Sequence, residues 1–140
     1  MFATTSAHAP NAFAGAYRQV GVATGVGAAS PHQLVLMLFD GFDDALAQAI
    51  GALRDGAIES KCRAIGRAAR IVDEGLKTSL DMDGGGTLAA DLRDLYAYVS
   101  LRLLQANLNN DGALLDECRR LMRPIRDAWA SIAPAAPYST

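Results

Sequence analysis

The stretch Leu88–Asp111 constrains the fold more than any other part of the chain, because it has the period of one long helix with two apolar faces. At about 100° per residue, the first face has Tyr96 at its edge and consists of Leu88, Leu92, Leu95, Val99, Leu103 and Ala106. The second apolar group points away from the first and consists of Tyr98, Leu101, Leu104 and Leu108. A helix that faces a single core needs only one apolar face.

Periodicity alone leaves two interpretations of the second face open. In the first, the helix is central and packs on both sides within its own fold, as helices that are apolar all round usually do. In the second, the face is a groove for the amphipathic helix of a partner, which would be anchored by apolar side chains at helical spacing.

Two further helices are predicted before this stretch. The first begins at Ser30, which forms a capping box with Gln33, and it ends in the turn Arg54–Gly56. The second runs from about Ala57 to Leu80. Its predicted core stripe consists of Ile58, Cys62, Ile65, Ala69, Val72, Leu76 and Leu80. A small apolar flank beside that stripe could admit another helix closely, from within the fold or from outside, and consists of Ala64, Ala68, Ile71 and Gly75.

The last helix completes the prediction of the fold class. Thr87 is the predicted cap of the long helix, and Asn110 or Asp111 caps the one that follows. Pro124 lies inside the pattern of the last helix and should kink or divide it. Because no stretch alternates as a strand does, the sequence predicts an all-α, antiparallel four-helix bundle, with a short fifth helix if Pro124 divides the last one.

The two ends of the chain lie outside this bundle pattern. Residues 1–29 are predicted to form a flexible N-terminal arm, residues 30–133 the bundle, and residues 134–140 a disordered tail. Glycines at 21, 25 and 27 disfavour a stable helix in that part of the arm. Tyr17 and Val20 leave two interpretations open, because the arm could be a plain linker or a strand or turn docked through these two side chains.

Composition argues against several classes of function. The net charge of −2 and a pI of about 5.6 give no electrostatic reason to bind nucleic acid or an anionic membrane. No apolar run approaches the roughly 18 residues of a membrane span, and the N-terminus lacks the basic and apolar regions of a secretory signal. Cys62 and Cys118 fall on apolar stripes, so the prediction is two buried free thiols in a reducing cytoplasm.

Residues with catalytic or metal-binding chemistry are sparse. His8 and His32 are the two histidines, and neither belongs to the Glu-x-x-His pair of a di-iron bundle. The glycines at 84–86 are not followed by the Gly-Lys-Ser/Thr of a phosphate loop, and three acids at 40, 43 and 44 are typical of a solvated helix face. The prediction is therefore a binding protein that is not an enzyme and has no cofactor or metal.

Five segments of the chain resemble the FliS family of flagellin export chaperones. They are AYRQV at 16–20, SPHQLVLMLFDGF at 30–42, SLDMDGGG at 79–86, LYAYVSLRLLQANLNND at 95–111 and RDAW at 126–129, and they occur in the family's order. The resemblance implies a cytoplasmic helical bundle that binds the C-terminal segment of flagellin, which is disordered in the monomer. Binding would prevent premature polymerisation and help delivery to the flagellar type III export apparatus.

The resemblance also implies a set of partner-binding residues. In the family the N-terminal segment can lie over the bundle and be moved by flagellin, which gives Tyr17 and Val20 a role. Together with the two faces described above, the predicted partner-binding residues are Tyr17, Val20, Ala64, Ala68, Ile71, Gly75, Tyr98, Leu101, Leu104 and Leu108. An export-gate component or an anti-sigma factor is a further candidate partner.

A second class of function remains as the alternative. The second face of the long helix could be the seam of a homodimer in a self-associating bundle with a structural or signalling role. A signalling bundle with His32 as phosphoacceptor ranks below it, because a helix start beside a proline differs from an exposed position in the middle of a helix.

Overall fold

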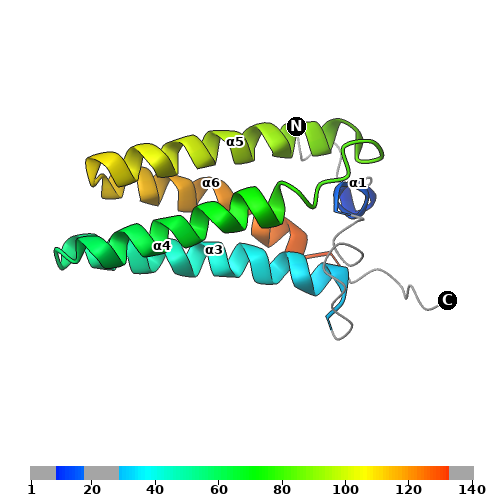
Figure 1. Cartoon of the computed structure of the whole chain (residues 1–140). Coiled ribbons are helices and arrows are strands. Elements are labelled where there is room, and N and C mark those ends of the chain that lie inside the picture. Colours follow the sequence, from blue (N-terminus) through cyan, green and yellow to red (C-terminus); the bar gives the residue numbers. More distant parts are fainter. Residues whose placement is uncertain (1–8, 18–28, 133–140) are drawn as a thin grey trace.

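The computed structural model describes residues 9–17 and 29–132, and every regular element in these ranges is a helix (Figure 1). The elements are α1 (Ala9–Ala16), α3 (Pro31–Arg54), α4 (Ile58–Arg70), the π-helical turn η2 (Ile71–Leu76), α5 (Gly86–Asn109) and α6 (Gly112–Ala130). The four long rods α3, α4–η2, α5 and α6 run along a common direction, and α1 lies at the end of the bundle where α5 begins (Figure 1). The predicted all-α bundle is confirmed. None of the described helices is long and apolar enough to span a membrane.

Local capping signals fix several of the helix ends as predicted. The Ser30 hydroxyl accepts a hydrogen bond from the Gln33 amide at 3.1 Å, and the Gln33 side chain accepts one from the Ser30 amide at 3.1 Å. Asp111 caps α6, where its carboxylate accepts from the Ala113 amide at 3.0 Å. The start of α5 differs slightly, because its cap is Gly85 and Thr87 lies within the first turn.

The core of the bundle lies between the inward faces of the four rods. From α3 it takes Val35, Phe39, Phe42 and Leu46, and from α5 it takes Ala89, Leu92, Tyr96, Val99, Leu103 and Ala106. Leu88 and Leu95, which the sequence placed on the core face, are only partly buried. Tyr96, predicted at the edge of that face, is fully buried because its hydroxyl has a hydrogen-bond partner inside the protein.

The second rod differs from its prediction in both register and length. The α-helix ends at Arg70 and continues as η2, and the segment from Lys77 is a turn, so it does not run as one helix to Leu80. Ile58 and Cys62 are exposed, whereas Lys61 is buried. The prediction of a buried thiol is therefore wrong for Cys62 and confirmed for Cys118.

Pro124 does not divide the last helix. α6 is assigned as one helix from Gly112 to Ala130 with Pro124 inside it, so the short fifth helix predicted after the proline does not form. Pro124 is exposed, and buried side chains hold the helix on both sides of it, namely Met122 before and Trp129 after. The extra helix of this fold is instead at the N-terminal end, in the range predicted to be an arm.

The sequence left open whether the N-terminal arm is a plain linker or docks on the bundle as a strand or turn. In the structure part of this arm docks, and the docked segment is the helix α1. Phe13, Ala16 and Tyr17 are buried, with 4%, 0% and 1% of their surface exposed. Residues 1–8 and 18–28, which include Val20, lie outside the described residues, as does the tail 133–140.

Candidate partner-binding face

The outer side of α5 carries an uncovered group of apolar side chains. Tyr98 is 41% exposed, Leu101 51%, Leu104 55% and Leu108 74%. Seven large apolar side chains are exposed among the described residues, and these are four of them. We call these four side chains the α5 face. The second apolar group that the sequence predicted on this helix is thus not covered within the described part of the fold.

A polar cluster borders the α5 face on the side of α6. The Tyr98 hydroxyl donates to Glu117 Oε2 at 2.9 Å, and Arg102 Nε donates to Glu117 Oε1 at 3.2 Å. The hydrogen bond from Tyr98 lowers the pKa of Glu117, and the hydrogen bond from Arg102 lowers it further by a smaller amount. The Arg102 guanidinium also lies 5.4 Å from the centroid of the Tyr98 ring. Tyr98 is therefore held in place at this border.

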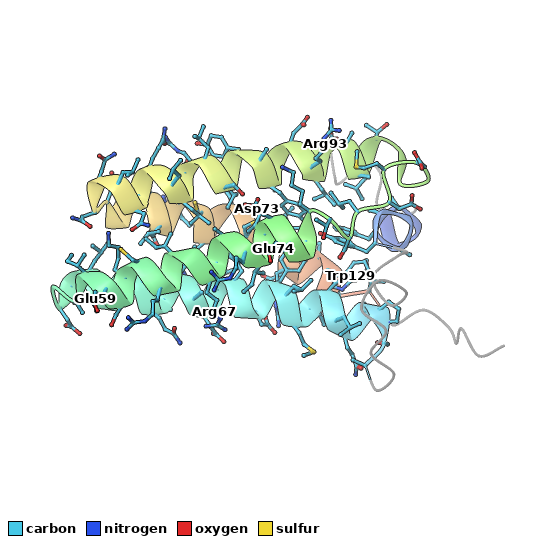
Figure 2. All side chains as sticks on the ribbon, in the orientation of Figure 1. Glu59, Arg67, Asp73, Glu74, Arg93 and Trp129 are labelled. Carbon is cyan, nitrogen blue, oxygen red and sulfur yellow. The ribbon has the colours of Figure 1, made fainter. Side chains whose placement is uncertain are left out.

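A second polar border lies on the side of α4 and η2. The Ser100 hydroxyl donates to Asp73 Oδ1 at 2.7 Å, and Figure 2 shows Asp73 between η2 and α5. Nearer the C-terminal end of α5, Lys61 Nζ donates to the Asn107 main-chain carbonyl at 3.0 Å and to Asn107 Oδ1 at 2.8 Å. Leu101, Leu104 and Leu108 thus project between two polar borders that attach α5 to the rest of the bundle.

The small flank of the second rod is not an open surface, which corrects the sequence interpretation. Ala64 is 7% exposed and Ala68 is 0% exposed, whereas Ile71 and Gly75 are half-buried. A Cβ atom at Gly75 would lie 2.9 Å from Leu38 Cδ2 of α3. The flank therefore packs closely on α3, since small side chains let two helices approach. The sequence left open whether this flank packs on a helix of the same fold or on a helix of a partner. In the structure it packs on α3 of the same fold.

Tyr17 lies at the other end of α5, inside the bundle. Its hydroxyl is hydrogen-bonded to the hydroxyl of Tyr96, and burial raises the pKa of both phenols. Phe13 and Tyr17 each meet the ring of Trp129 edge-on at 5.5 Å, and the His32 ring stacks on Trp129 at 5.0 Å. With α1 docked, Tyr17 cannot contact a partner, and Val20 is not among the described residues.

The glycine segment 84–86 provides the seat for α1, a role that the sequence interpretation missed. A Cβ atom at Gly85 would lie 2.4 Å from the Asp81 carbonyl oxygen and 3.1 Å from Ala16 Cα. Only glycine fits between these atoms without a shift of the backbone. The Asp81 amide also donates to the Ala16 carbonyl. The three glycines predicted a break in the chain here, but they could not show which distant segment packs against it.

Ion pairs join α3 to α6. Arg119 donates to both carboxylate oxygens of Asp43, at 2.9 and 3.1 Å, and Arg126 Nε donates to Asp40 at 2.9 Å. The Arg119 hydrogen bond holds the pKa of Asp43 below its ordinary value. Two of the three acids interpreted as a solvated face therefore have partners on α6. Among the described residues, no group of three or more His, Cys, Asp or Glu side chains could hold a metal ion.

Within residues 9–17 and 29–132 the apolar α5 face is uncovered, an architecture typical of proteins that bind a helical segment of a partner. Comparison with known proteins agrees, because residues 13–136 match the family described as flagellar protein FliS. The chain is 46% identical to the flagellar secretion chaperone FliS of Salmonella typhimurium over 123 residues, covering 88% of this chain and 91% of the relative. It is 44% identical to the flagellar secretion chaperone FliS of Escherichia coli, covering 81% and 84% of the two chains. It is 40% identical to FliSB of Pseudomonas aeruginosa, covering 84% and 92%.

The chain belongs to the FliS family of flagellar secretion chaperones. Its role is that of a flagellar export chaperone, and membership of a chaperone family implies a non-enzymatic function.

Proposed function

We propose that this chaperone acts in the cytoplasm and binds the C-terminal segment of flagellin on the α5 face. Binding keeps that segment from polymerising before export and helps to deliver flagellin to the type III export apparatus. The observation that carries the proposal is the exposure of Leu101, Leu104 and Leu108, at 51%, 55% and 74%, on one helix of a folded bundle.

The physical argument concerns the cost of ordering a flexible segment. A disordered segment loses conformational entropy when it folds on a surface, and burial of apolar area must offset that loss. Tyr98, Leu101, Leu104 and Leu108 recur every three or four residues, so they form a continuous ridge on α5. An amphipathic helix with apolar side chains at the same spacing can lay them along this ridge.

The test is to measure molar mass by light scattering after mixing the full chain with a synthetic peptide of the flagellin C-terminal segment. The proposal predicts a complex of one chain and one peptide. A homodimer that does not change on addition of the peptide would contradict it and would favour the α5 face as a dimer seam. An export-gate component or an anti-sigma factor as a second partner stays a prediction, because no described contact bears on it.

A further inference from the structure

The C-terminal end of α5 closes with a left-handed residue and leaves the Asn107 carbonyl without a main-chain donor from the residues that follow. Asn110 adopts the left-handed conformation at φ 51°, and its amide donates to the Ala106 carbonyl. The Asp111 amide also donates to the Ala106 carbonyl, at 3.0 Å. In a continuing helix, that Asp111 amide would instead donate to the Asn107 carbonyl.

A side chain from the neighbouring rod takes the place of that donor. Lys61 of α4 donates from Nζ to the Asn107 carbonyl at 3.0 Å and to the Asn107 side-chain oxygen at 2.8 Å. Helix C-termini favour a cation, and the last turn of α5 has no basic residue of its own. Lys61 supplies this charge from another element.

The burial of Lys61 shows that the contact is specific. The residue is 3% exposed, and a buried ammonium group is costly unless hydrogen bonds satisfy it. Here two acceptors from the last turn of α5 do so. The same turn carries Leu108, the most exposed member of the α5 face, and Leu104 lies one turn before it.

We propose that Lys61 is a positioning residue for partner binding, because it caps the end of α5 and holds Leu104 and Leu108 in register for an incoming helix. This inference rests on the function proposed above. Lys61 does not touch the partner, and it acts through Asn107. Preorganising this turn lowers the entropy that the bundle loses on binding, since the last turn of a helix otherwise frays.

The variant Lys61→Met keeps most of the length and apolar stem of the side chain and removes the charged donor. In the free chain we expect hydrogen exchange of amides 106–111 to become about tenfold faster, whereas exchange at the centre of α5 stays unchanged. Affinity for the flagellin C-terminal peptide should fall about five- to tenfold. Lys61→Arg, which can donate to the same two oxygens, should restore most of the affinity.

Two controls separate positioning from a general loss of stability. Lys77→Met removes the same charge after η2 and should leave affinity unchanged. All binding titrations are made at a temperature at which circular dichroism shows each variant to be folded. In a double-mutant cycle, Leu108→Ala should cost less affinity in the Lys61→Met background than in the unaltered chain, because the turn that carries Leu108 is already loosened.

The outcomes distinguish this inference from the function on which it rests. If the unaltered chain does not bind the peptide, the proposed function and the role of Lys61 in binding are both rejected. If the unaltered chain binds and folded Lys61→Met binds equally well, only the role of Lys61 is rejected. The role is also rejected if Lys61→Met weakens binding but the effects of Lys61→Met and Leu108→Ala are simply additive.

Discussion

At the scale of single residues, Ala68 shows how little room the core of the bundle leaves beside α4. Its side chain is fully buried in the core of the bundle. Ala68→Trp should therefore destabilise the chain by about 1–3 kcal/mol through overpacking, measured by urea unfolding. Ala47→Trp, at an exposed position of α3, is the matched control and should change stability by less than about 0.5 kcal/mol. An Ala68→Trp variant that is as stable as the parent but binds peptide poorly would restore the idea of an open flank.

Asp43 makes stability depend on pH in a predictable direction. Its pKa is lowered in the folded state, chiefly by the Arg119 hydrogen bond, so the folded chain holds this proton less tightly than the unfolded chain. The stabilisation is present above the ordinary pKa of an aspartate and is lost as the pH falls through the lowered folded value. Because the side chain is 38% exposed, the effect should stay below about 1 kcal/mol.

The check is a series of urea unfolding curves at decreasing pH. Asp43→Asn should be less stable than the parent at neutral pH, and the difference should shrink as the pH falls through the acid range. Asp44→Asn, at the exposed neighbouring position, is the control. A constant difference between Asp43→Asn and the parent at every pH would show that the charge of Asp43 contributes nothing.

At the scale of elements, α1 depends on contacts that are far away in sequence. Tyr17→Ala removes the hydrogen bond to Tyr96 and one of the rings against Trp129, so α1 should detach while the four rods stay folded. Trp129, the single tryptophan, should then shift its fluorescence emission to longer wavelength. Ala14→Gln, on the exposed side of α1, should leave the emission unchanged. An unchanged spectrum for Tyr17→Ala would mean that α1 stays docked without this side chain.

The elements also show which structural features a sequence can predict. The start of α3 was predictable because its cap, Ser30, and its partner, Gln33, are three residues apart. The second apolar face of α5 was predictable because the helix has more apolar surface than one core requires, but its exposure was not, since a helix buried on both sides has the same pattern. The side of α4 that is buried was not predictable. Burial of Lys61 requires an acceptor for its ammonium group, and that acceptor is Asn107, 46 residues further along the chain.

The N-terminal helix was missed for a related reason. Residues 9–16 are mostly small, and their local pattern gave no strong helical signal. What holds the helix is the space over Gly85 and the ring of Trp129, and both lie far away in sequence. The packing partner of the small flank on α4 and η2 could not be predicted, because small apolar residues favour close helix contact equally well inside and outside a fold.

At the scale of the whole molecule, the two ends of α5 have different tasks. The end near Gly86 receives α1 (Figure 1). Tyr17 holds α1 there, because its hydroxyl is hydrogen-bonded to Tyr96 and its ring packs edge-on against Trp129. The other half exposes apolar side chains between two polar borders, and Lys61 closes its last turn. Among the described residues, the α5 face is exposed while the core between the rods is buried, so a partner could contact this face without displacing the core.

The measurement that tests this account most directly is the affinity of Leu101→Glu for the flagellin C-terminal peptide, determined by calorimetry beside Met37→Glu. Met37 is 62% exposed on α3, so both substitutions place a carboxylate on the surface, and both chains should keep their circular dichroism and melting temperature. The account predicts that Leu101→Glu weakens binding at least about tenfold, because a charge would be desolvated under the bound helix, whereas Met37→Glu binds as the parent does. Equal affinities for the two folded variants would contradict the account, because the peptide would then bind elsewhere than on the α5 face.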